Sequence, residues 1–179
     1  MQIYSVHHFY LQDDGIFPNN DGFPVIHYRA ALQIPWWRPA NYILKLFKKN
    51  NWSNGWNDGV YDYHHYHSIT HEALGVYKGH TILLLGGGNG VRVTVEKGDV
   101  LIIPAGVAHK NLYPENVFGC VGAYPNGSAY DMNTGKPGER PDADDQILQV
   151  PVPDQDPVFG GTGEMYRILQ ENHFVHISL

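Results

Sequence analysis

The sequence predicts an all-β protein: a small antiparallel barrel or double-sheet jelly roll, preceded by an N-terminal arm that contains one helix. The composition is the first sign, because 20 glycines, 12 prolines and an aromatic share of 13% are typical of short strands joined by tight turns. The second sign is the regular spacing of glycine-bearing turns after residue 60. The 179 residues contain no visible internal repeat, so one domain is expected rather than two barrels.

The N-terminal arm, residues 1–58, is expected to pack on the barrel. Within it, residues 39–50 have the clearest helical pattern, because Ile43, Leu46 and Phe47 fall on one face of a helix. The other expected elements of the arm are strands at about 3–11 and 25–32, turns at 13–15 and 18–22, and a polar loop at 50–58.

The barrel core is expected between residues 59 and 125. Apolar or alternating segments separated by glycine-bearing turns predict its strands. These strands are expected at about 60–67, 71–78, 80–85, 91–96, 99–103, 107–112 and 117–124.

A C-terminal extension, residues 126–179, is expected to close on the same domain. Residues 141–148 predict a short helix, with Pro141 at its first position and three aspartates complementing the helix dipole. The prolines of residues 150–157 exclude a central strand. Residues 165–169 and 174–177 are expected to pack against the barrel.

Charge and composition exclude several classes of function. A formal net charge of −6 and a pI of about 5.9 argue against a nucleic-acid groove. The sequence has no apolar run near the ~20 residues that span a bilayer, and its first residues do not form a signal peptide. Cys120, the single cysteine, lies in an apolar run and predicts a buried, inert thiol. We therefore expect a cytoplasmic protein.

Four side chains in the core segment predict a metal site. Residues two apart on a strand share a face, so His65 and His67 are expected to point together into the barrel. A turn then returns the chain, so that Glu72 can face the same cavity, and His109 follows a later turn at the start of another strand. Three imidazoles and one carboxylate suit a divalent ion of Zn, Fe, Ni, Mn or Co.

The residues alone leave alternatives open. Some of the eleven histidines stand next to each other by chance, and a histidine on a strand is commonly a core or surface residue. His64 and His71 are expected to face away from the site, as supporting or surface residues, although a bulge would bring His71 in as a competing ligand. Tyr61 and Tyr63 share the parity of His65 and are expected in the core or on the cavity wall.

Two patterns resemble the signature motifs of the cupin superfamily. The spacing of Gly59, His65, His67, Glu72 and Gly79 resembles the first motif. The spacing of Gly98, Pro104, Gly106 and His109 resembles the second. The second motif usually continues with asparagine four residues after its histidine, where this chain has Tyr113, with Asn111 nearby. Segments around residues 17–20, 122–125 and 137–141 extend the resemblance to a group of bacterial single-domain cupins.

This resemblance implies a cupin barrel with a metal held by His65, His67, Glu72 and His109. It also implies a metal-dependent enzyme, dioxygenase- or isomerase-like, acting on a small polar organic molecule, with no catalytic residue assigned beyond the ligands. The alternative is a non-catalytic cupin that binds a small molecule or sugar and uses its metal as a structural or ligand-anchoring ion. Some cupins retain the barrel without metal, and many form homodimers through their N-terminal strands.

Overall fold

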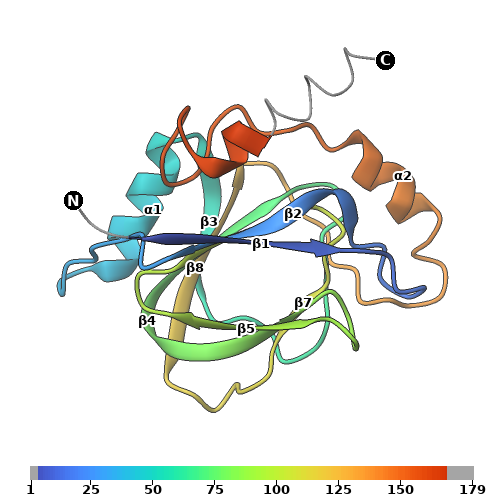
Figure 1. Cartoon of the computed structure of the whole chain (residues 1–179), viewed down its shortest axis with the longest axis horizontal. Coiled ribbons are helices and arrows are strands. Elements are labelled where there is room, and N and C mark those ends of the chain that lie inside the picture. Colours follow the sequence, from blue (N-terminus) through green and yellow to red (C-terminus); the bar gives the residue numbers. More distant parts are fainter. Residues whose placement is uncertain (1–3, 169–179) are drawn as a thin grey trace.

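The structure is a computed structural model that describes residues 4–168 of the chain. It is mostly β, with two named helices outside the strands (Figure 1). The strands are β1 (Ser5–Leu11), β2 (Asn20–Arg29), β3 (Trp52–Asp58), β4 (Glu72–Leu85), β5 (Val91–Glu96), β6 (Val100–Ile103), β7 (His109–Asn111) and β8 (Phe118–Pro125). The helices are α1 (Pro39–Lys49) and α2 (Asp142–Gln149).

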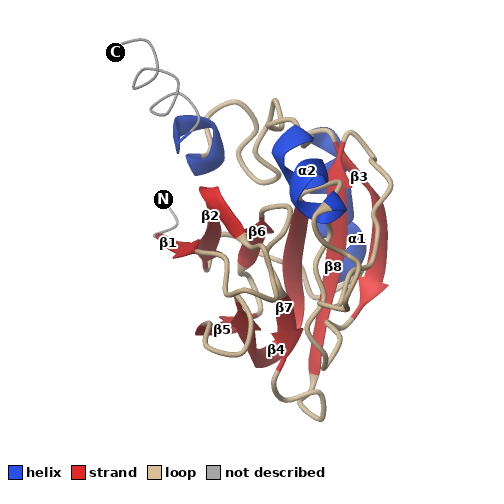
Figure 2. Cartoon of the chain, turned by 90° about the vertical axis from the view of Figure 1, so that its right-hand side faces the viewer, coloured by secondary structure: helices blue, strands red, loops and turns tan. Residues whose placement is uncertain are grey.

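The long strand β4 organises the sheet. Its first half pairs with β6 and β8, and its second half pairs with β5 and β7. The complete order is β1-β2-β6-β4-β8-β3, with β5 and β7 paired to β4 beside this path, and every pair is antiparallel. Figure 2 shows β4, β8 and β3 running side by side. This arrangement confirms the predicted all-β, antiparallel jelly-roll fold with one helix in the N-terminal arm.

Gly79 explains why β4 is one strand where the sequence predicted two. The residue has a φ of +65°, and a Cβ built on it would lie 1.5 Å from the carbonyl oxygen of Val117. Only glycine fits such a close approach of two backbones in this conformation. The glycine therefore lets the strand continue from one set of partners to the other, and the predicted turn at this position was wrong.

The two faces of β4 contact two separate hydrophobic clusters. Leu74 and Val76 face the barrel interior, as the sequence predicted. Gly75, with the opposite parity, lies under α1, and a Cβ on it would lie 2.6 Å from Ile43 and 3.1 Å from Phe47. The helix therefore covers the outer face of the sheet through the apolar face that its sequence predicted.

Two other predicted segments differ from the structure. Residues 50–58 were predicted as a loop, but residues 52–58 form β3, which pairs only with β8 at the edge of the sheet. An edge strand is partly exposed, so most of its positions can be polar. The sequence of β3 therefore lacks the alternation of apolar and polar residues that predicts a strand. Residues 60–67 were predicted as a strand, but only His65 and Tyr66 form isolated bridges there. β2 also begins at Asn20, inside an expected turn.

The C-terminal part packs mainly through short segments. α2 confirms the predicted short helix, although Pro141 precedes its first residue as the N-cap. Residues 164–168 form a helical turn, and Met165 and Ile168 join the core that contains Tyr28. The expected contacts of residues 169 and 174–177 lie outside the described residues. Within residues 4–168, neither helix is long and apolar enough to span a membrane.

Candidate metal centre

Three histidines from two segments converge inside the barrel. His65 and His67 lie on the loop between β3 and β4, and His109 begins β7. Their ligand-capable nitrogens all lie within 4.8 Å of one another, and each of these residues is buried. The backbones of His65 and His109 exchange two hydrogen bonds, of 3.2 and 3.0 Å, which fixes these two residues face to face.

Glu72, the first residue of β4, adds a carboxylate to this cluster. Its Oε2 lies 3.5 Å from His67 Nε2 and 3.4 Å from His109 Nε2. It is followed on the same face by Leu74, so the alternation of β4 directs the carboxylate inward. The structure therefore brings together the four residues that the sequence singled out, while their role as metal ligands stays a prediction.

Backbone carbonyl oxygens set the tautomer of all three imidazoles. The Nδ1 of His65 contacts the carbonyl of Tyr63 at 3.2 Å, and that of His109 contacts the carbonyl of Val107 at 3.0 Å. The Nδ1 of His67 contacts the carbonyl of Asp131. A carbonyl only accepts, so each Nδ1 carries the proton and donates it. Each Nε2 is then the free ring nitrogen, the one that can bind a metal or a second proton.

The protonation states in the cluster follow from burial and from the charge of Glu72. Burial, with the nearby His109, lowers the pKa of His65 to about 3. Burial also acts to lower the pKa of His67, but hydrogen bonding and charge attraction from Glu72 outweigh it and raise that pKa. Burial would raise the pKa of Glu72, yet its histidine partners hold this pKa far below its usual range. A neutral imidazole and an ionised carboxylate are the forms that bind a metal.

A chain of two hydrogen bonds holds the other oxygen of Glu72. The hydroxyl of Tyr124, on β8, donates to Glu72 Oε1 at 2.9 Å, and Trp56 Nε1 donates to the Tyr124 hydroxyl at 2.9 Å. Gly122 makes room for this chain, because a Cβ there would lie 2.2 Å from the Trp56 ring. Tyr124 was not predicted as a site residue, although it lies two residues after Gly122 and four after Cys120 and so shares their inward face.

A segment that we call the strap, residues 126–149, holds the histidine loop from outside. Within it, the Asp131 carboxylate accepts hydrogen bonds from the Ser68 amide, at 2.8 Å, and from the Ser68 hydroxyl. Asn133 and Tyr66 exchange two backbone hydrogen bonds of 2.9 and 3.0 Å. The Tyr66 hydroxyl donates to Glu139 at 3.2 Å. Because these contacts flank His67 on both sides, the strap fixes the position of that imidazole.

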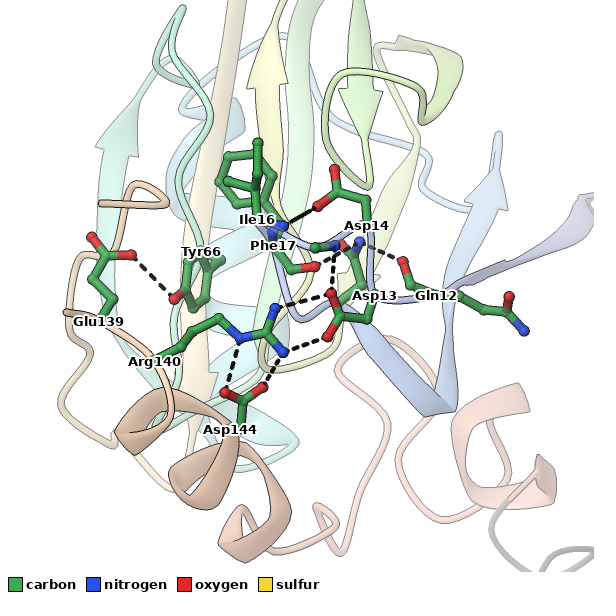
Figure 3. Close-up of polar contacts among 11 residues, drawn as sticks. Gln12, Asp13, Asp14, Ile16, Phe17, Tyr66, Glu139, Arg140 and Asp144 are labelled. Carbon is green, nitrogen blue, oxygen red and sulfur yellow. Dashed lines mark hydrogen bonds and ion pairs between the residues drawn. The ribbon is translucent and has the colours of Figure 1, made fainter. Parts of the chain in front are cut away.

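Arg140 ties the strap to the turn that follows β1 (Figure 3). Its guanidinium donates to both carboxylate oxygens of Asp13 and to both of Asp144 in α2. In the same turn, Asp14 Oδ1 accepts from the amides of Ile16 and Phe17 at 2.9 and 2.7 Å. The Phe17 ring then packs edge-on against Tyr66, with centroids 6.1 Å apart.

A cavity of about 150 Å³ opens beside the four clustered residues. Among residues 4–168, its walls include no lysine or arginine. The lining residues are Trp56, Asp58, Gly59, Val60, Tyr61, His65, His67, Glu72, Leu74, His109, Tyr124, Tyr130 and Met132.

Of His64, His71, Tyr61 and Tyr63, only Tyr61 lines the cavity. His71 is buried outside the cluster and accepts a 3.0 Å hydrogen bond from the amide of Ala105, and burial lowers its pKa to about 4. It is therefore neither a surface residue nor a competing ligand here. His64 packs on Phe17, at a ring distance of 5.2 Å, outside the cluster. Tyr61 lines the cavity, whereas Tyr63 lies outside the lining.

The thiol of Cys120 takes no part in the site. It is fully buried among the apolar residues of the barrel interior. Burial raises its pKa well above the usual value, so the thiol is held protonated. This confirms the predicted burial of Cys120.

Comparison with solved structures finds proteins of low sequence identity and low TM-score. One is an acireductone dioxygenase from Bacillus anthracis with a cadmium ion in its active centre: 16% identity and a TM-score of 0.37, covering 51% of this chain and 62% of that one. Another is the Escherichia coli ribosomal oxygenase YcfD: 15% identity and a TM-score of 0.38, covering 99% of this chain and 56% of that one. The chain thus spans less than two thirds of either oxygenase, and TM-scores below 0.5 carry no argument about function.

Sequence comparison gives a firmer result. No family model matches the chain. A protein of Bacillus subtilis (strain 168), named uncharacterized protein YjlB, is 40% identical over 152 residues, which cover 85% of this chain and 89% of the relative. With that identity over most of both sequences, the chain belongs to the family of Bacillus subtilis YjlB.

Proposed function

We propose that this protein is a metal-binding cupin that holds one divalent transition metal ion through His65, His67, Glu72 and His109. We further propose that it is a metal-dependent enzyme, dioxygenase- or isomerase-like, acting on a small polar organic molecule. One observation carries the proposal: ligand-capable nitrogens of three buried histidines lie within 4.8 Å of one another, and the buried Glu72 Oε2 lies 3.5 and 3.4 Å from two of them. Buried imidazole nitrogens and a carboxylate oxygen grouped in this way are the donor set of a protein metal site.

The donor set fits a transition metal. Imidazole nitrogens with one carboxylate suit Zn, Fe, Ni, Mn or Co, and mixed nitrogen and oxygen ligation does not select among them. In known metal sites, ligating histidines donate their second ring N–H to a carbonyl or carboxylate, and all three imidazoles here make that contact. When bound, the ion would supply Lewis-acid or redox chemistry.

The chain's own groups would orient the ligands and shape the substrate space. The carbonyls of Tyr63, Val107 and Asp131 fix the imidazole rings, and Tyr124 fixes the carboxylate. The buried walls around the cluster limit the access of bulk water. Among residues 4–168, the cavity wall carries one further carboxylate, Asp58, as a candidate for moving a proton.

A binding module is the second candidate. Apart from the four clustered residues, the described lining carries one acidic side chain, Asp58, and no lysine or arginine. A site with so little acid–base equipment is also suited to holding a small molecule or sugar on an anchoring ion without converting it. The same experiment separates the two candidates.

The experiment screens small polar compounds against protein loaded with Fe(II) or Zn(II). Compounds that raise the melting temperature of the loaded protein are then followed by proton NMR for conversion. We expect conversion by loaded protein, and none by chelated protein or by the His65→Ala/His109→Ala variant. Full conversion by metal-free protein would contradict the proposal, and stabilisation without conversion would favour the binding module.

Three further features belong to this proposal. We propose that residues 1–58, 59–125 and 126–179 act as one domain and that the protein is cytoplasmic. We also propose a homodimer formed through the N-terminal strands. Among the described strands, β1 pairs on one side only, with β2, which leaves an edge for a second copy. Sedimentation analysis tests the dimer.

A further inference from the structure

The cavity beside the histidine cluster changes character from its floor to its mouth. The four clustered residues are buried and form a polar floor. The lining residues Tyr61, Tyr130 and Met132 are 52%, 44% and 42% exposed, so they mark the opening to solvent. A ligand that fills the cavity would therefore meet polar atoms at its inner end and aromatic and thioether surface at its outer end.

Both tyrosines at the mouth are held in place by neighbouring rings. Tyr130 stacks on the buried Tyr124, with centroids 4.6 Å apart and an angle of 21°, and meets His67 at 5.3 Å. Tyr61 stacks on Tyr63 at 4.9 Å and meets His65 edge-on at 5.3 Å. Rings already fixed by such contacts lose little conformational freedom when a flat ligand packs against them.

The size of the cavity limits the ligand. A volume of about 150 Å³ is comparable with protein cavities that hold a benzene molecule. The space thus suits a single six-membered ring or a group of similar size, together with a short polar head that reaches the floor.

The charges on the wall limit the ligand further. Among residues 4–168, no lysine or arginine lines the cavity, and Asp58 adds a carboxylate to that of Glu72. A second anionic group on a ligand would find no cationic partner on this lining and would be repelled by the exposed Asp58 and by Glu72. The wall therefore disfavours ligands with a carboxylate or phosphate beyond the head group.

We infer that the site takes an uncharged, planar, single-ring compound whose oxygen-bearing head reaches the histidine cluster while its ring packs against Tyr130 and Tyr61. This inference rests on the proposed function, because the head group needs the bound metal. It adds the chemical class of the ligand.

Three hydroxamates test the class on zinc-loaded protein by isothermal titration calorimetry, after zinc binding itself has been titrated. Acetohydroxamate presents the head alone, benzohydroxamate adds an uncharged ring, and 4-carboxybenzohydroxamate adds a second negative charge. We expect benzohydroxamate to bind about tenfold more tightly than either of the other two, in line with the packing of one ring and with the repulsion of a second negative charge by Asp58 and Glu72.

Two variants locate the preference. Tyr130→Leu should remove most of the advantage of benzohydroxamate over acetohydroxamate, whereas Tyr113→Leu, at an exposed position outside the lining, should leave it unchanged. Asp58→Lys should make 4-carboxybenzohydroxamate the tighter ligand of the two ring compounds. Asp58→Asn serves as the milder change if the lysine variant melts at a lower temperature.

The outcomes separate this inference from the proposed function. Failure of the wild-type protein to bind zinc or any of iron, nickel, manganese and cobalt would overturn both. Zinc binding with 4-carboxybenzohydroxamate as the tightest ligand, or with no advantage of the ring over the acetyl group, would overturn the inference alone.

Discussion

Tyr124 decides how Glu72 presents its carboxylate to the three histidines. Its hydroxyl occupies Oε1 and is itself held by Trp56, so that Oε2 remains for the imidazoles. Burial, with the charge of Glu72, raises the pKa of Tyr124, so the hydroxyl keeps its proton and acts as a donor. Tyr124 is therefore a positioning residue, which acts on the site through Glu72.

The Tyr124→Phe variant removes this donor while keeping the ring. We expect its affinity for zinc to fall by about tenfold or more, the size of effect seen when a partner of a metal ligand is removed. Calorimetric titration of zinc measures the affinity, and Tyr113→Phe, at an exposed position away from the cavity, is the matched control. An affinity equal to that of the wild type would show that Tyr124 does not position Glu72.

Sequence pattern was a good guide to individual residues where the chemistry is local. The spacing of His65 and His67, the position of Glu72 and the turn before His109 all pointed to one site, and the structure places these residues together. The carbonyls that orient His65 and His109 are local, but Glu72 and His67 are oriented by Tyr124 and Asp131, which are 52 and 64 residues away in the chain. Such partners depend on strand register and on the path of a loop, which no local pattern specifies.

Among the elements, the strap depends on carboxylates that accept several hydrogen bonds. Glu139 accepts from the amides of Thr134 and Gly135 at 2.8 Å each and from the Tyr66 hydroxyl. Burial would raise the pKa of Glu139, but these hydrogen bonds dominate and lower it below the ordinary value of 4.5. A lowered pKa in the folded state means that the ionised carboxylate stabilises the fold above that ordinary value. The stabilisation is lost as the pH falls through the lower folded value.

The Glu139→Gln variant tests this pH dependence. At pH 7 we expect its free energy of unfolding to be about 1 kcal/mol below that of the wild type, because hydrogen bonds to a charged acceptor are replaced by weaker ones. The difference should shrink as the pH falls below about 4.5, since the carboxylate of the unfolded chain takes up a proton there while that of the folded chain does so only at lower pH. Urea unfolding at pH 7 and at a pH below about 4.5 measures the difference in free energy of unfolding, with Glu115→Gln, at an exposed position, as control. A difference that stays constant with pH would contradict the role assigned to the charge.

The element boundaries show where sequence patterns are limited. The helix α1 has a clear apolar face and was predicted closely, because its period is carried by its own residues. β3 was missed because it lies at the edge of the sheet with one partner strand, and the histidine loop was read as a strand because its alternation serves the site rather than a sheet. A strand signal therefore reports alternating burial, whatever its cause.

On the scale of the whole molecule, the sheet separates two apolar clusters, one on its outer face and one inside the barrel. The outer cluster joins α1, the C-terminal turn and the outward face of the sheet, and the inner cluster fills the barrel below the histidines. The fold class could be predicted because glycine-bearing turns and short apolar segments recur along the chain. The strand order could not, since it depends on β4 serving four partner strands, a long-range arrangement.

The central claim is that this barrel exists to hold a metal ion at His65, His67, Glu72 and His109. The most direct measurement is elemental analysis of the purified protein, before and after reloading with zinc, iron, nickel, manganese or cobalt. The matched variants are His65→Ala/His109→Ala and His80→Ala, the latter replacing an exposed histidine on β4. We expect near-stoichiometric metal in the wild type and in His80→Ala, and loss of the metal in the double variant. A wild-type protein that takes up none of these ions, or a double variant that keeps its full metal content, would contradict the claim.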